Sequence, residues 1–152
     1  PNIRSMGVAL SPCIVPKAGK PTFSIAEDEI EVGMGIHGEA GIEVRKMMTA
    51  DEIAETLVST ILKDMPLNQG DEVSVMVNGL GATPLEEQLI VYRKVYQILN
   101  EMGIAVVMPH VGEYATSMEM AGLSVTIFKL DQELKALLLE PAETPFYTNT
   151  NK

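Results

Sequence analysis

The chain has 152 residues, and its 21 acidic side chains against 11 basic ones give a formal net charge of −10 at neutral pH. A surface of that sign repels nucleic-acid backbones and anionic lipids, which argues against nucleic-acid binding and membrane attachment. A lone cysteine, the lack of an apolar run of about 18 residues and the lack of a secretory signal pattern together predict a cytoplasmic location.

The first third of the chain predicts three strands. Ser5 to Leu10 reads as a strand, and residues 11–21, with three prolines and a glycine, read as an extended loop. Apolar and polar residues alternate over Glu29 to Ile36 and again over Ile42 to Met47. These two runs predict strands joined by a glycine turn, with His37 at its mouth.

Two helices are predicted, each with a capping signature at its start. Thr49 and Glu52 form a capping box before a helix that extends to about Lys63. Thr83, followed by Pro84, predicts the cap of a second helix that reaches Glu101. The apolar residues that should form its buried stripe are Leu85, Leu89, Tyr92, Val95, Tyr96, Leu99 and Met102.

The remaining strands complete a predicted α/β (α+β) domain. Val73 to Val77, Ile104 to Met108 and Leu123 to Leu130 read as buried strands, and Asp131 caps a short third helix. We expect two layers, with a mixed sheet of about six strands and helices mainly on one face. Residues 1–140 form the domain, and residues 141–152 are a tail or linker.

The segment Gly33 to Glu39 contains the main candidate for chemistry, His37, which stands between glycines. A histidine there either acts as a nucleophile or is merely a hydrogen-bonded turn residue. Glu39, two residues on, either orients the imidazole or is solvated. Glu31 and Glu43 flank the same turn and are expected at the surface.

The other candidates carry weaker signals. The turn Asn78 to Pro84 joins a strand to a helix start, where an anion can bind, but it matches no Walker or dinucleotide motif, and a structural turn is the preferred interpretation. His110 is 73 positions from His37, and Cys13 is distant from both, so no metal site is predicted. Cys13 itself is expected to be buried and inert.

Four motifs follow one another along the chain: Met6 to Cys13, Gly33 to Glu39, Asn78 to Pro84 and Thr116 to Gly122. Together, over about residues 4–138, they resemble dihydroxyacetone kinase, in the C-terminal half of its substrate-binding subunit. The resemblance implies that His37 bonds covalently to the ketone of dihydroxyacetone. It also implies that the N-terminal domain of the subunit is absent from this chain.

The resemblance further implies that this chain is a fragment that is inactive alone. By the same resemblance, the chain is expected to bind no cofactor itself, and the phosphoryl group is expected to come from an adenine nucleotide, ATP or ADP with magnesium, on a partner subunit or domain. Whether ATP or a phosphotransferase-system phosphoprotein is the donor stays open. A homodimer is expected, as in the family.

Two alternatives remain. Some relatives of this subunit sense dihydroxyacetone and co-activate a transcription regulator without catalysis. The third interpretation is a dimerisation domain in which His37 is idle.

Overall fold

The computed structural model describes residues 2–36 and 41–150 and contains a mixed sheet of seven strands. The strands are β1 (Ile3–Ser11), β2 (Glu29–Val32), β3 (Glu43–Lys46), β4 (Glu72–Gly79), β5 (Ala105–Val106), β6 (His110–Gly112) and β7 (Ala121–Leu130). They are arranged in the order β3-β2-β1-β7-β4-β5, and β6 also pairs with β4. β5 and β6 run parallel to β4, whereas the other pairs are antiparallel.

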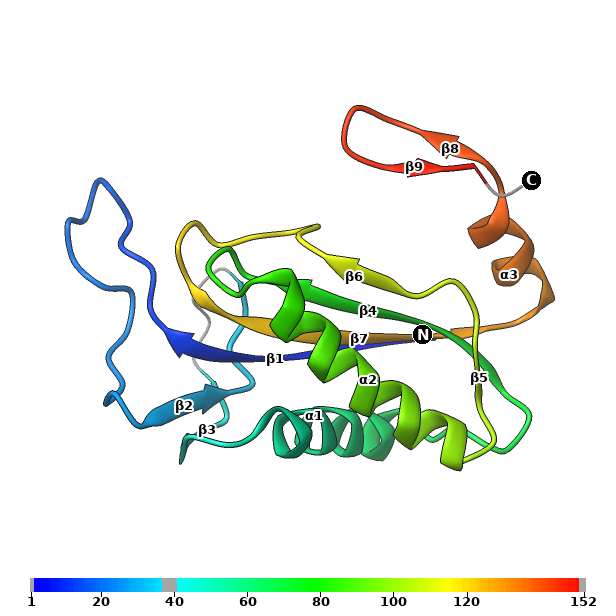
Figure 1. The fold of residues 1–152 in the computed structure, drawn as a ribbon, viewed down its shortest axis with the longest axis horizontal. Helices are drawn as coiled ribbons and strands as arrows, with labels where there is room; N and C mark the ends of the chain where they lie inside the picture. The colour runs from blue at the N-terminus through cyan, green and yellow to red at the C-terminus, as the bar shows by residue number, and fades with distance from the viewer. Residues whose placement is uncertain (1, 37–40, 151–152) are drawn as a thin grey trace.

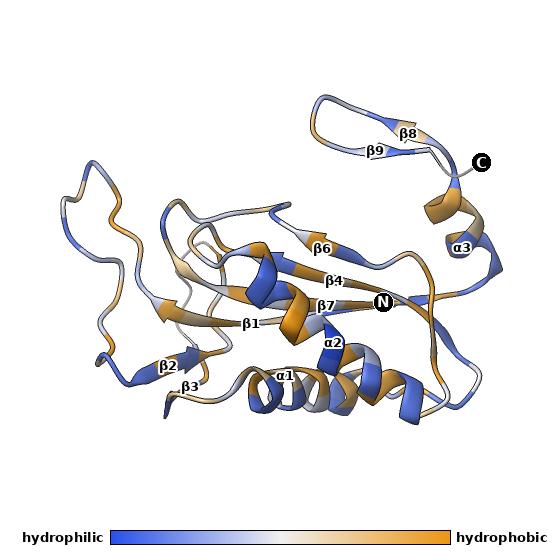
Figure 2. Ribbon diagram, viewed as in Figure 1, coloured by the Kyte–Doolittle hydropathy of each residue, from blue (hydrophilic) through white to orange (hydrophobic). Residues whose placement is uncertain are grey.

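Helices α1 (Ala50–Asp64) and α2 (Leu85–Glu101) pack side by side on one face of this sheet (Figure 1). Alternate residues of β4 and β7 point toward them and are buried, because successive side chains of a strand face opposite sides. Figure 2 shows the hydrophobic residues of these strands and helices. The buried strand residues are Val73, Val75, Val77, Leu123, Val125 and Ile127. This confirms the predicted two-layer α/β domain, with seven strands instead of about six.

Helix α1 begins as predicted, with both halves of the capping box formed. The Thr49 hydroxyl accepts a hydrogen bond from the backbone N–H of Glu52, and the Glu52 carboxylate accepts one from the backbone N–H of Thr49 at 2.8 Å. These bonds satisfy two N–H groups that have no partner within the helix.

The predicted cap of α2 is wrong. Pro84, and not Thr83, is the N-cap residue, and its apolar side chain makes no capping bond. The Thr83 hydroxyl instead accepts from the backbone N–H of Gly122 at 2.8 Å. The end of the helix at Glu101 is confirmed.

The buried stripe of α2 agrees with the prediction at Val95 and Leu99 but differs at other positions. Leu85, Leu89 and Tyr96 are exposed. The buried residues are Gln88, Val91, Val95 and Leu99.

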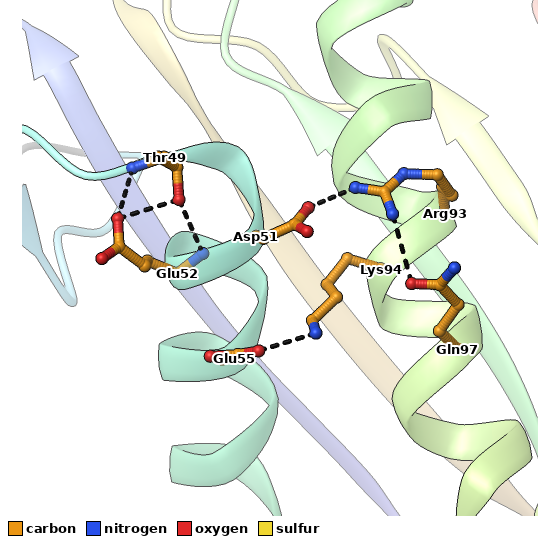
Figure 3. Close-up of polar contacts among 7 residues, drawn as sticks. All are labelled: Thr49, Asp51, Glu52, Glu55, Arg93, Lys94 and Gln97. Atoms are coloured by element: carbon orange, nitrogen blue, oxygen red, sulfur yellow. Dashed lines mark hydrogen bonds and ion pairs between the residues drawn. The ribbon is translucent and has the colours of Figure 1, made fainter.

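Ion pairs connect α1 and α2. Arg93 binds Asp51, and Lys94 Nζ lies 2.7 Å from Glu55 Oε1 (Figure 3). Both basic residues of α2 thus face α1.

Several shorter elements depart from the expectations. β2 ends at Val32, four residues before the predicted end of its strand, and β6 was not predicted. Helix α3 (Gln132–Leu139) is capped by Asp131 as expected. Strands β8 (Ala142–Glu143) and β9 (Thr148–Asn149) then form a small hairpin in the segment predicted as tail or linker.

Candidate functional site

A pocket of about 500 Å³ lies along the edge of β1, between the loop that follows β2 and the end of α1. Its walls are Gly33–Ile36 and Ile42 on one side and Thr60 and Asp64 of α1 on another. Its floor is formed by side chains of β1, β7 and β4 that alternate with the buried core residues. Apart from Met6, the sheet residues that line the pocket do not belong to the core under the helices.

Gly33 sets the direction of the backbone directly after β2, where the chain begins to line this pocket. Its φ is +85°, a conformation that side-chain-bearing residues rarely adopt. A Cβ atom at Gly33 would lie 2.8 Å from Cγ1 of Ile42. Its N–H donates to the Gly7 carbonyl at 2.7 Å, so the loop is held against β1. A glycine is thus required at this position.

The far end of the same turn is held by Glu31. Its Oε1 atom accepts a hydrogen bond from the Gly41 N–H at 2.6 Å, and the side chain is half-buried. Glu31 is therefore a structural part of the turn, which the expectation of a plain surface residue missed. Glu43 does lie at the surface, where it pairs with Arg45.

The predicted nucleophile and its neighbour, His37 and Glu39, lie outside the described residues. The described residues on both sides of them, Gly33–Ile36 and Ile42, line one pocket. The sequence did not single out Ser5, Ser124 or Thr126, which lie in its floor. The available signal was the pair of small polar residues two positions apart, Ser124 and Thr126, between apolar residues of β7.

The turn Asn78 to Pro84 has a structural role, as preferred. The Asn78 amide nitrogen donates to the Ala115 carbonyl at 2.7 Å, and its oxygen accepts from the N–H groups of Tyr114 and Ala115. Gly81 has a φ of +127° and pairs with Met120. The side chains of this turn are thus used to hold neighbouring loops.

The second histidine lies away from the pocket, on β6. His110 Nε2 is 2.9 Å from the hydroxyl of Tyr147, and the rings of His110 and Tyr114 meet in a T-shaped arrangement. Burial lowers the pKa of His110, although a hydrogen bond with the Met108 carbonyl opposes that shift. His110 thus connects the body of the domain to the β8–β9 hairpin.

Cys13 is buried, as expected, with its sulfur 3.7 Å from the hydroxyls of Thr22 and Ser117. Within residues 2–36 and 41–150, no cluster of three or more metal-ligating side chains is present. In the same part of the chain, no helix is long and apolar enough to cross a membrane.

The sequence is similar to known proteins over almost its whole length. Residues 1–146 match the family model described as the Dak1 domain, and the chain therefore belongs to that family. It is 47% identical over 146 residues to the dihydroxyacetone-binding subunit DhaK of PTS-dependent dihydroxyacetone kinase 2 from Listeria innocua, covering 96% of this chain and 44% of that protein. It is 49% identical over 148 residues to L-erythrulose kinase from Pectobacterium atrosepticum, covering 95% and 25%.

Two solved structures extend the comparison. The dihydroxyacetone kinase operon co-activator Dha-DhaQ matches with a TM-score of 0.81 and 33% identity, over 91% of this chain and 43% of that one. The dihydroxyacetone kinase from C. freundii, solved in complex with AMP-PNP and Mg²⁺, matches with a TM-score of 0.81 and 27% identity, over 97% and 27%. The chain thus spans less than half the length of each of these relatives.

Proposed function

We propose that the chain is the ketone-binding part of a dihydroxyacetone kinase, from the C-terminal half of its substrate-binding subunit, with His37 as the nucleophile that holds the substrate. One observation carries the proposal. Residues that flank the His37 segment on both sides, Gly33–Ile36 and Ile42, line a single pocket. Glycine at position 33 and the Glu31–Gly41 hydrogen bond position these flanks.

The chemistry is a reversible addition to the ketone. The lone pair of a neutral imidazole nitrogen attacks the carbonyl carbon, and the π electrons move to the oxygen. That oxygen takes up a proton while the second ring nitrogen releases one, which gives a neutral hemiaminal. The bonded nitrogen has no proton left to lose, so no imine forms.

A covalent anchor of this kind favours phosphoryl transfer because it positions the substrate hydroxyl that is to be phosphorylated. It holds a terminal hydroxyl of the short ketone in one orientation, and in-line placement supplies much of the rate enhancement in such reactions. Glu39 is proposed to orient the imidazole. The adenine nucleotide and its magnesium are proposed to sit on a partner subunit or domain, and the protein is proposed to act in the cytoplasm as a homodimer.

A second candidate function is supported by one comparison. The co-activator with a TM-score of 0.81 shares this fold, so the chain is also compatible with a ketone-sensing partner of a transcription regulator. Phosphoryl transfer distinguishes the two functions, because only the kinase passes a phosphoryl group to the ketone when the full-length protein meets its donor subunit.

Calorimetric titration of the full-length protein with dihydroxyacetone tests the proposed ketone site. A free histidine titrates near pH 6.5, and protons compete with ketone for the same nitrogen. We expect affinity to be retained in mildly basic buffer and to fall, by up to about tenfold per pH unit, once His37 is protonated. The His37→Asn variant should show no binding, whereas His110→Asn, the matched control, should bind normally. Unchanged binding by His37→Asn would refute the proposal.

A further inference from the structure

A second pocket, of about 390 Å³, lies where helix α2 begins, beside the carboxyl ends of the parallel strands β4 and β6. Its walls come from the turn before α2, the first turn of that helix and the end of β6. It shares no lining residue with the pocket beside β1. In open α/β sheets, the crevice outside the carboxyl ends of the strands is a frequent place for ligands.

The wall of this second pocket contains a buried amide whose oxygen lacks a partner. Gln88 is 1% exposed, and its amide nitrogen donates to the Thr83 carbonyl and to Glu113 Oε1, each at 2.8 Å. Two acceptors on one side of the amide identify that side as the nitrogen. The Gln88 oxygen has no hydrogen bond in the part of the chain that the structure describes. Because buried carbonyl groups are nearly always hydrogen-bonded, this oxygen requires a donor that the chain itself does not supply.

Glycine at position 79 makes room for this arrangement. A Cβ atom at Gly79 would overlap Glu113 Oε1 and the amide nitrogen of Gln88. The glycine therefore lets both side chains lie across the end of β4. Glu113 is exposed, and it forms no ion pair with any other described residue. Its carboxylate is thus available to a positively charged group.

The start of α2 adds hydrogen-bond donors to the pocket. Pro84 and Leu85 line it, and Pro84 occupies the N-cap position without a side-chain capping bond. Within residues 2–36 and 41–150, the first backbone N–H groups of α2 with an acceptor are those of Glu87 and Gln88, which donate to the Pro84 carbonyl. The N–H groups of Leu85 and Glu86 are therefore left for an external acceptor. Such groups, together with the helix dipole, favour a carboxylate or phosphate.

Neither an anion nor a cation alone matches this pocket. An anion would meet the Glu113 carboxylate and those of Glu86 and Glu87, which are exposed in the first turn of α2. A cation would meet the positive end of the helix dipole. A small molecule that carries both an ammonium group and a carboxylate satisfies both parts of the wall.

We propose that this pocket binds a free α-amino acid with a small apolar side chain. The ammonium group donates to the Gln88 oxygen and to the Glu113 carboxylate, and the carboxylate accepts from the N–H groups at the start of α2. The apolar side chains of Ala82, Leu85 and Val111 in the pocket wall face the side chain of the amino acid. A volume of about 390 Å³ lies within the usual range for small-molecule sites.

Calorimetric titration of the full-length protein with L-valine tests the proposal. We expect saturable binding of L-valine, and binding at least about tenfold weaker for isovalerate, which lacks the ammonium group, and for isobutylamine, which lacks the carboxylate. Glu113→Gln removes the charge and keeps the size of the side chain, so it should weaken L-valine binding about tenfold. Glu143→Gln, the matched control, changes an exposed carboxylate of β8 outside the pocket and should bind as the wild type does.

The outcomes decide the amino-acid site separately from the ketone site. The proposal would be overturned by the absence of saturable L-valine binding to the wild type, by isovalerate or isobutylamine binding as tightly as L-valine, or by undiminished binding to Glu113→Gln. None of these results affects the ketone site, which the titration with dihydroxyacetone measures independently. Thermal unfolding of each variant establishes that any loss of binding occurs in a folded protein.

Discussion

Thr49 and Thr83 show how far a residue pattern alone predicts local structure. Both precede a helix in the pattern of a capping box, yet only Thr49 caps. The Thr83 hydroxyl instead accepts a hydrogen bond from the backbone N–H of Gly122, which is 39 residues away in the sequence. A local motif is therefore predictable when its partners are local, as for Glu52. It fails when a distant backbone group takes the same oxygen.

Gly81 offers a test of the structural role assigned to its turn. A Cβ atom there would lie 1.8 Å from the Met118 carbonyl oxygen, and the φ of +127° is strained for any side chain. We expect Gly81→Ala to lower the free energy of unfolding by about 3 kcal/mol or more, because a backbone clash adds to the strain. Denaturant unfolding measures the change.

Gly70→Ala is the matched control for that measurement. Gly70 has a φ of +90°, but nothing lies within 4 Å of the position of its missing Cβ. The expected loss is about 1 kcal/mol, from backbone conformation alone. Equal losses in the two variants would show that the contact with Met118 is not what requires glycine at position 81.

Helix α2 marks the limit of prediction for whole elements. Its position and its end at Glu101 followed from periodicity, but its buried face was predicted only in part, at Val95 and Leu99. Gln88, which no hydrophobicity pattern selects, is buried because its amide donates to the Thr83 carbonyl and to Glu113, both at 2.8 Å. β6 was missed for a related reason, since three residues with no alternation carry no signal.

The β8–β9 hairpin provides a pH-dependent test at this scale. Burial lowers the pKa of His110, so the unfolded chain binds a proton more readily than the folded one. The stability linked to His110 should be complete above pH 6.5, and it should be lost as pH falls from there through the lowered folded-state pKa. We expect thermal midpoints measured from pH 7.5 to pH 5 to fall less in His110→Gln than in the wild type. Parallel curves would contradict a lowered pKa of His110 in the folded protein.

For the molecule as a whole, the sequence predicted the α/β class and most strand positions, because the core strands are long and apolar. It also pointed to the turn that borders the pocket. It did not predict the pocket floor, since Ser5, Thr126 and Ser124 come together only through strand pairing between segments more than 100 residues apart. Sites formed by such pairing are not visible in local patterns.

The purified 152-residue chain is expected to transfer no phosphoryl group from ATP to dihydroxyacetone. It contains no Walker motif, and it spans 44% of the length of a dihydroxyacetone-binding subunit to which it is 47% identical. A coupled assay with Mg²⁺ measures the rate. Sustained turnover by the purified chain would mean that it holds nucleotide itself, contrary to the proposal of a separate donor.

The covalent role of His37 is tested most directly by mass spectrometry of the intact full-length protein under gentle conditions, after incubation with dihydroxyacetone. We expect the wild type to gain the mass of one dihydroxyacetone, without loss of water, because the hemiaminal forms by simple addition. Borohydride should fail to trap that adduct, since no imine is present. His110→Asn should retain the adduct, and His37→Asn should show none. A covalent adduct that persists in His37→Asn would contradict the assignment of His37 as the nucleophile.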